Sequence, residues 1–197
     1  AVRHPERSSA PFEAGRPGAS VTRHREIRPA ASEFPSYYAP YVAAVPDGDI
    51  VAHLRAEGEA SAAWLATLDH AAARHRYAPE KWSVAEVIGH VADTERVFTY
   101  RALRFARGDA TPVAGFDENL FAAVAGHDER EPADLAAELA AVRAATVALF
   151  ASLAAAAWER HGEANGKPVS VRALAWITAG HALHHWRIVR ERYGIGG

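Results

Sequence analysis

The sequence contains no cysteine in 197 residues. Disulfide bonds, thiolate metal ligands and a cysteine nucleophile are therefore all excluded. Any metal site in this chain must use histidine and carboxylate ligands. Any thiol chemistry must take its sulfur from a small molecule.

A long apolar run and a strong charge are lacking as well. No stretch reaches the roughly 18 apolar residues of a membrane-spanning helix, so we expect no membrane contact. Residues 1–10 lack the apolar core of a secretory signal, which favours a cytoplasmic protein. The 22 basic and 24 acidic side chains give a net charge of −2, whereas nucleic-acid-binding proteins usually carry a dense basic face. Hydrophobic residues make up 49% of the chain, enough for the core of one domain.

Residues 1–35 differ in composition from the rest of the chain. They hold five prolines and six arginines and have almost no periodic apolar pattern. Proline at this density blocks helix interiors, and a segment with few large apolar residues cannot offset its ordering entropy by burial. We therefore expect a flexible tail over residues 1–35 and one folded domain over residues 36–197. An arginine-rich arm that contacts an acidic partner is the alternative.

Most of the folded part is predicted to be helical, because apolar residues recur at steps of three and four. Ser83 and Glu86 form a capping box, Pro132 fits the first turn of a helix, and Ser170 is a helix cap. The predicted long helices cover residues 50–75, 84–107, 133–160 and 171–193.

Shorter segments connect these helices. A short helix is expected near residues 117–124, and residues 161–168 are expected to form a loop. Four long helices with no strand predict an all-α four-helix bundle, with the short helix in the connection between the second and third long helices. The tyrosine- and proline-rich residues 37–46 are expected to pack on the bundle surface. Core or dimer contacts are expected for Trp82, Trp158, Trp176 and Trp186.

The helical period singles out a few of the eleven histidines. With about 100° per residue, His181 lies at the centre of the apolar stripe of the last helix, and His185 flanks it one turn on. Side chains four residues apart are neighbours that can share one ion, although the period also allows a pair of His181 with His184. His90 lies on the stripe of the second long helix that is expected to face the core. Most others, such as His127, are expected to be solvated.

A histidine on an apolar face costs free energy unless both ring nitrogens find partners. A single inward histidine is most often a hydrogen-bonded core residue. Two helices that each place histidine mid-stripe, one of them as His-x-x-x-His, also indicate a metal site. The His-Glu-x-x-His motif of zinc proteases is absent, so the sequence does not support that mechanism.

Several segments resemble the DinB-like superfamily of bacterial metal-binding four-helix bundles. The resemblance rests on KWSVAEVIGHVADTER at residues 81–96, on Gly108-Asp109, on FDEN at residues 116–119, and on residues 170–190 with their GHALHH. It covers about residues 37–193. The family places one metal ligand in the Trp-Ser…Gly-His segment and two in the final His-x-x-x-His. The resemblance therefore implies the ligands His90, His181 and His185, and favours His185 over His184.

The resemblance also implies a broad function. Family members with known activities are thiol-dependent transferases and isomerases that use low-molecular-weight thiols such as bacillithiol or mycothiol. Others are described as metal-dependent hydrolases, and members are commonly homodimers. The implied cofactors are a divalent metal ion, such as Zn, Ni, Fe or Co, which imidazoles accept alike, and a low-molecular-weight thiol cosubstrate. The implied partners are a small-molecule substrate and a second copy of the chain.

Three neutral imidazoles would leave coordination positions open, as in catalytic zinc sites. An open cationic centre lowers the pKa of bound water or deprotonates a bound thiol. The first hypothesis is therefore a thiol-dependent S-transferase, in which a metal-bound thiolate attacks a small electrophile. The alternatives are a metal-dependent hydrolase that uses metal-bound hydroxide and a non-catalytic binding bundle that the metal stabilises.

Further residues are candidates for supporting roles. Asp93 and Thr94 follow the predicted ligand of the second long helix by three and four residues, where a side chain can orient it. Arg101 lies on the same stripe and could bind a substrate carboxylate. Glu118 and Asn119 could overhang the site from the connection. The ordinary alternatives are a surface aspartate for Asp93 and an interhelical salt bridge for Arg101.

Overall fold

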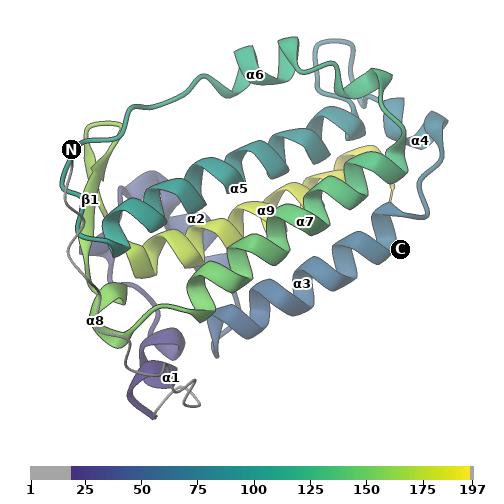
Figure 1. The fold of residues 1–197 in the computed structure, drawn as a ribbon. Coiled ribbons are helices and arrows are strands. Elements are labelled where there is room, and N and C mark those ends of the chain that lie inside the picture. The colour runs from purple at the N-terminus through teal and green to yellow at the C-terminus, as the bar shows by residue number, and fades with distance from the viewer. Residues whose placement is uncertain (1–18, 196–197) are drawn as a thin grey trace, which may run out of the picture.

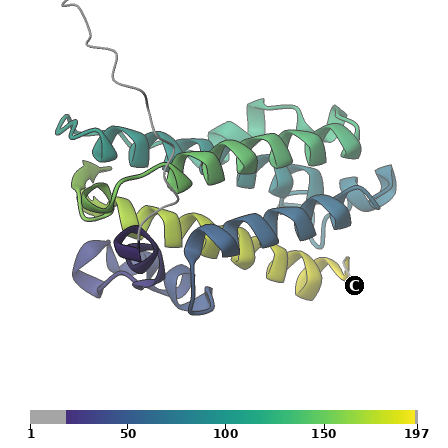
Figure 2. The same cartoon turned by 60° about the horizontal axis from the view of Figure 1, so that its bottom comes forward.

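The computed structural model describes residues 19–195, with side chains from residue 23 onward. Its long helices are α3 (Ile50–Leu65), α5 (Val84–Ala106), α7 (Pro132–Ala151) and α9 (Val171–Tyr193). These helices lie side by side along one direction (Figures 1 and 2). Each contacts two of the others, in the order α3, α7, α5, α9 and back to α3. The predicted four-helix bundle is confirmed, as is the short helix, α6 (Glu118–Val124), between α5 and α7.

Shorter elements of the described residues complete the ends of the bundle. The remaining helices are α1 (Ala19–Glu26), α2 (Ala39–Ala44), α4 (His70–Arg74) and α8 (Ala155–Trp158). Turns of 3₁₀ helix are η1 (Ala31–Glu33), η2 (Ser36–Tyr38) and η3 (His127–Glu129). Strands β1 (His161–Ala164) and β2 (Lys167–Ser170) form a hairpin before α9.

Local hydrogen bonds begin the long helices where the sequence predicts. The Ser83 hydroxyl accepts from the Glu86 N–H (3.0 Å), and the Glu86 carboxylate accepts from the Ser83 N–H (2.8 Å), which is a capping box at the start of α5. Pro132 is the first residue of α7. The Ser170 hydroxyl accepts from the Ala173 N–H (2.9 Å) at the start of α9. The two serine hydroxyls satisfy backbone donors that a helix start leaves free, and Pro132 has no N–H that would need a partner.

The first long helix is shorter than predicted, because it ends at Leu65 instead of about residue 75. The Thr67 hydroxyl donates to the Trp64 carbonyl (2.7 Å), so this carbonyl of the last turn has a side-chain donor as its partner. Asp69 then accepts from the Ala72 N–H (2.8 Å) and begins the separate helix α4. Short polar side chains end the helix by competing for its backbone groups.

The third long helix is also shorter, because α7 ends at Ala151 instead of about residue 160. The Ser152 hydroxyl donates to the Leu149 carbonyl (2.7 Å), and Arg25 donates to the Ala151 carbonyl (2.6 Å). The final carbonyls of α7 are thus satisfied without a further turn. The short helix α8 follows after a break.

The expectation of a loop at residues 161–168, and of no strand, is wrong. β1 and β2 pair antiparallel around Asn165 and Gly166, whose φ angles of 50° and 70° are both positive. Asn-Gly is the preferred pair for such a two-residue turn. The connection after α5 joins this hairpin, because the Val113 N–H donates to the Glu163 carbonyl (2.9 Å).

Residues 1–18 of the predicted tail lie outside the described residues. Residues 19–35 contain α1 and η1 and lie at the end of the bundle that carries α8 and the hairpin (Figures 1 and 2). Glu33 is buried and accepts from the Ser170 hydroxyl (2.7 Å) and from Arg172 (2.8 Å). The chain therefore joins the bundle before residue 36, where the sequence placed the boundary, because Glu33 is the buried partner of polar groups at the start of α9.

The core consists of two apolar clusters that follow one another along the bundle. One contains Phe105 and Trp176, and the other contains Val87 and Trp186. Buried polar side chains from all four long helices lie where the clusters meet, and we call this set the polar layer: Ser61, His90, Thr94, Glu95, Arg143, Thr146, Thr178 and His181. The side chain of Glu57 extends it on α3.

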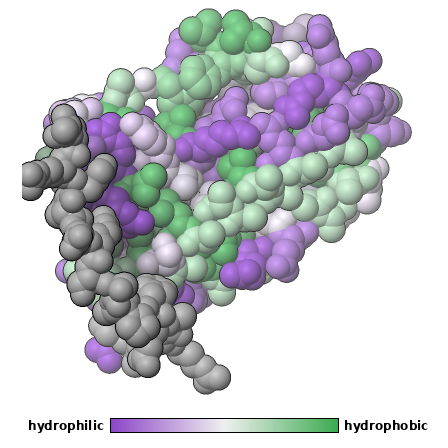
Figure 3. Space-filling model, viewed as in Figure 1, coloured by the Kyte–Doolittle hydropathy of each residue, from purple (hydrophilic) through white to green (hydrophobic). Residues whose placement is uncertain are grey.

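The surface carries apolar residues in two places. Exposed alanines form a pale stripe along α7 (Figure 3). Separately, Leu120, Phe121 and Val124 of α6 are exposed. No helix among residues 19–195 combines the length and the apolar character that a membrane crossing requires.

Candidate metal centre

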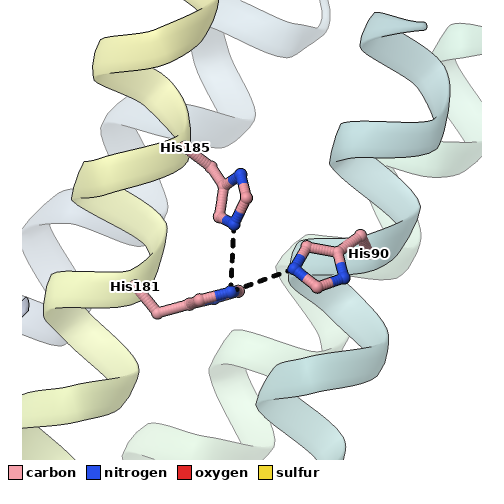
Figure 4. A group of neighbouring side chains, drawn as sticks. All are labelled: His90, His181 and His185. Atoms are coloured by element: carbon pink, nitrogen blue, oxygen red, sulfur yellow. Dashed lines mark hydrogen bonds between the residues drawn. The ribbon is translucent and has the colours of Figure 1, made fainter. Parts of the chain in front are cut away.

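Three histidine rings from α5 and α9 converge inside the bundle (Figure 4). His90 Nε2 lies 3.1 Å from His181 Nε2, and His185 Nε2 lies 3.1 Å from the same atom. The three possible ligand atoms are all within 4.8 Å of one another. An imidazole nitrogen carries either one proton or one lone pair, so His181 Nε2 cannot hydrogen-bond well to both neighbours. A single cation between the rings would satisfy all three.

Burial holds these rings in the neutral form. His90 and His181 are 4% and 5% exposed, and His185 is half-buried. Desolvation lowers the pKa of His90 to about 4 and that of His185 to about 3. It also holds the pKa of His181 well below its usual value, helped by the neighbouring rings. Neutral imidazole is the form that ligates a metal.

Of the two supporting candidates after His90, only Thr94 contacts it. The Thr94 hydroxyl lies 3.4 Å from His90 Nδ1, the ring nitrogen that faces away from the centre. Asp93 instead pairs with Arg96 (3.2 Å) and lies 3.9 Å from His127, although its charge opposes the lowering of the His90 pKa. A hydroxyl at this place can fix the ring orientation.

Helix α2 packs on the centre through Tyr41, which the sequence placed on the surface. The Tyr41 ring meets His181 edge to face at 5.6 Å and lies 5.1 Å from His184. A Cβ atom on Gly180 would lie 2.0 Å from the Tyr41 carbonyl oxygen, so only glycine permits this approach. Burial and the charge of Glu118 raise the Tyr41 pKa.

A cavity of about 240 Å³ reaches the half-buried ring of His185. Asn119 lines it, at the start of α6, together with Trp82, whose ring lies 4.7 Å from His90. Trp82 is thus half-buried at the centre instead of being a pure core residue, whereas Trp158, Trp176 and Trp186 are in the core as expected. Of the two residues that the sequence suggested could overhang the site, Asn119 lines the cavity that reaches His185.

Two other histidines lie nearby without joining the group. His184 is half-buried, with its ring 5.2 Å from that of His185. His127 is buried, contrary to the expectation of a solvated residue, and neither of its ring nitrogens has a hydrogen-bond partner. Its ring occupies the place of a side chain on Gly89, where a Cβ would lie 2.1 Å from Nε2. A glycine inside a helix was the available signal for such a close approach.

Three imidazoles converge between two helices of this four-helix bundle. The protein is therefore a helical bundle with a candidate metal centre. The profile of the DinB superfamily matches residues 53–189, more than half of the chain. The chain belongs to the DinB superfamily, as its motifs predict.

Two solved structures share the fold. YfiT from Bacillus subtilis, described as a probable metal-dependent hydrolase with an unusual four-helix bundle topology, aligns over 87% of this chain and 95% of its own, with a TM-score of 0.59 and 15% identity. A mycothiol-dependent maleylpyruvate isomerase aligns over 74% of this chain with a TM-score of 0.60 and 17% identity, and the match spans 61% of the isomerase. Comparison with curated proteins gives no significant match.

Proposed function

We propose that His90, His181 and His185 hold a divalent metal ion and that the chain is a metal-dependent enzyme, first of all a thiol-dependent S-transferase for small electrophiles. The convergence of three neutral imidazole nitrogens, with no carboxylate among them, carries this proposal. A bound divalent ion would supply Lewis-acid chemistry and lower the pKa of a thiol or a water molecule.

The donor set fits such an ion. Nitrogen ligands about 2.0–2.1 Å from zinc in a tetrahedral arrangement are roughly 3.3 Å apart, and two of the three Nε2 pairs are 3.1 Å apart. Three protein ligands leave a position for a substrate, as in catalytic zinc sites. The Thr94 hydroxyl would keep the Nε2 atom of His90 turned toward the ion.

The surrounding residues supply a small binding cavity. Its volume of about 240 Å³ is below the roughly 300–1,000 Å³ of drug-sized ligand pockets, which favours a small electrophile. The Trp82 ring offers an apolar wall, and the Asn119 amide offers both hydrogen-bond donors and an acceptor. His181 stays shielded from water while a substrate contacts the half-buried ring of His185.

The sulfur must come from a cosubstrate, because the chain has no cysteine. The shared fold with a mycothiol-dependent isomerase supports a thiol at this site. A metal-dependent hydrolase, in which water replaces the thiol, is the second candidate, and the shared fold with YfiT supports it. A non-catalytic, metal-stabilised bundle is the third.

Elemental analysis of the purified protein tests the metal site. The native chain should carry close to one divalent ion per polypeptide, and His181→Ala should carry almost none. His184→Ala is the matched control on the same helix and should retain the metal. Equal metal content in the native chain and His181→Ala would refute the site.

Product formation then separates the three candidates. A transferase should convert 1-chloro-2,4-dinitrobenzene only when bacillithiol or mycothiol is present. A hydrolase should cleave p-nitrophenyl acetate without any thiol. If His90→Ala loses the ion and changes only the melting temperature, with no turnover by either form, the non-catalytic bundle is correct. The expected homodimer is tested separately by sedimentation of the purified chain.

A further inference from the structure

Arg101 is a buried guanidinium for which the described residues supply almost no partner. The residue is 3% exposed and lies on α5. Its Nη2 donates to the Ala114 carbonyl (3.1 Å), and its Nε is buried without a hydrogen bond. A guanidinium has five N–H donors, and burying a charge without partners costs free energy. The sequence alternative of an interhelical salt bridge does not hold, because the ion pairs of residues 23–195 do not include Arg101.

Arg143 shows how the same bundle satisfies a buried arginine. It is 4% exposed, yet its Nε and Nη2 donate to both oxygens of Glu95 (2.8 and 2.9 Å). Its Nη1 donates to the Leu54 carbonyl (3.0 Å) and pairs with Glu57. Compared with Arg143, the free donors of Arg101 indicate a partner other than the residues that the structure describes.

Arg101 lies beside the candidate metal centre. Its guanidinium carbon is 6.0 Å from the centre of the Phe98 ring. The same ring packs edge to face against His181 at 5.8 Å and against Tyr38 at 5.9 Å. The guanidinium and the metal ligand His181 are thus separated by one aromatic ring.

We propose that Arg101 binds a carboxylate of the molecule that reacts at the metal centre. This inference rests on the proposed function and narrows it to small electrophiles that carry a carboxylate. The Nε edge of a guanidinium presents two parallel N–H donors that match the two oxygens of a carboxylate. Ala114 is exposed and belongs to the connection between α5 and α6, so the Arg101 guanidinium lies beneath that connection.

Dicarboxylates of increasing length test this placement in the Co(II)-loaded protein. Malonate, succinate, glutarate and adipate are compared with monocarboxylates of the same chain length, and binding is followed by the visible spectrum of Co(II). One dicarboxylate should bind at least about tenfold more tightly than its monocarboxylate, because it gains a charge-assisted bidentate contact. Arg101→Gln should remove this preference.

Control variants show that the effect is local. Arg107→Gln makes the same change at an exposed position of the same helix end and should keep the full preference. Cobalt content and melting temperature show whether Arg101→Gln is folded. If it does not fold, Arg101→Lys decides instead, because a point charge cannot form the bidentate contact and should weaken the preferred dicarboxylate about fivefold to tenfold.

Several results would overturn the inference. Equal binding of dicarboxylates and monocarboxylates by the native protein is one, and an unchanged preference in Arg101→Gln, or in Arg101→Lys, is another. Inorganic phosphate that competes as well as the best dicarboxylate would overturn the assignment to a carboxylate.

Failure of the proposed function has a different signature. A protein that takes up no Co(II) has no such metal centre. Calorimetric titration of the metal-free protein with glutarate then decides the role of Arg101 alone. Binding that Arg101→Gln abolishes would retain the carboxylate site, and the absence of binding would overturn it.

Discussion

Two groups of side chains in and beside the polar layer, an ionic half and a histidine half, differ in whether the described residues supply partners for their buried polar groups. In the ionic half, which we define as Glu57, Glu95, Arg143 and Trp186, each charged group meets an opposite charge. Arg143 binds both oxygens of Glu95, and the Trp186 indole donates to Glu57 (2.6 Å). This half joins all four long helices.

The histidine half, His90, His181 and His185, contains three like groups that face one another. Each ring has a nitrogen turned toward the same point, and no acid among the described residues joins the group. Hydrogen bonds among the rings do not explain such an arrangement, because His181 Nε2 offers either one proton or one lone pair and cannot satisfy both neighbouring nitrogens. The comparison teaches that buried polar groups with partners hold this fold together, whereas those without partners indicate a bound ligand.

Breaking the ionic half should give the largest effect. Arg143→Met leaves Glu95 buried without its partner, and it should lower the free energy of unfolding by about 3–5 kcal/mol. Urea denaturation measures this loss. Arg187→Met is the control, because it breaks an exposed pair with Glu191 (2.7 Å) that is worth about 0–1 kcal/mol. Equal losses in the two variants would contradict the structural role of the ionic half.

Acid should weaken the histidine half of the metal-free protein. The pKa values of His90 and His185 are lowered to about 4 and about 3, below the value of about 6.5 in an unfolded chain. The unfolded state therefore binds more protons, so this stability is complete above pH 6.5 and is lost as the pH falls toward these folded-state values. Two such groups should cost about 2–3 kcal/mol between pH 6 and pH 5.

Urea denaturation at a series of pH values measures how steeply the free energy of unfolding falls with pH. His185→Asn should reduce this slope by the equivalent of about one bound proton. His75 is an exposed histidine, and His75→Gln should leave the slope unchanged. In the loaded protein the folded ligands take up protons only as the pH approaches these lowered pKa values, about 4 for His90 and about 3 for His185, so the metal should be lost at that lower pH. Full metal content at about pH 3 would argue against ligation by imidazole alone.

A glycine lies against a neighbouring group in each half, Gly180 beside the histidines and Gly58 beside Arg143. Replacing each with alanine compares how tightly the two halves are packed. A Cβ on Gly180 would lie 2.0 Å from the backbone oxygen of Tyr41, whereas a Cβ on Gly58 would lie 2.4 Å from the side chain of Arg143. Backbone cannot move aside easily, so Gly180→Ala should cost about 2 kcal/mol. Gly58→Ala should cost less, because the arginine stem can shift and alanine favours the helix by about 1 kcal/mol.

Thermal denaturation and Co(II) titration distinguish the two variants. Gly180→Ala should also weaken Co(II) binding, because it displaces α2 from His181, and Gly58→Ala should not. A Gly180→Ala protein with a raised melting temperature and full Co(II) affinity would show that α2 does not support the centre.

The sequence predicted those features that depend on local hydrogen bonds or on helical period. Ser83 and Ser170 cap helices through neighbouring backbone groups, and the period placed His90 and His181 on inward faces. The resemblance to a family then selected His185. Each of these inferences needs only nearby residues or a known pattern.

Features that depend on tertiary approach were missed. Nothing local places Tyr41 against His181, or buries His127 against Gly89, because segments far apart in the chain meet there. Arg143, in an alanine-rich helix, carries no local sign that two acids on other helices receive it. The hairpin at Asn165 was missed because its strands are too short for an apolar pattern, although its turn residues were visible.

The smallest expected effect concerns Thr94, the one residue outside the histidine half that gives a candidate ligand a side-chain hydrogen-bond contact among the described residues. Thr94→Val removes the hydroxyl 3.4 Å from His90 Nδ1 and should weaken Co(II) binding about tenfold, because the ring loses the group that orients it. Co(II) titration against a competing chelator measures this change. Thr178→Val is the control, since the Thr178 hydroxyl is buried but donates to the Leu174 carbonyl (2.7 Å) of its own helix, and it should leave the affinity unchanged. Equal affinities in the two variants would show that packing against Trp82, and not Thr94, orients His90.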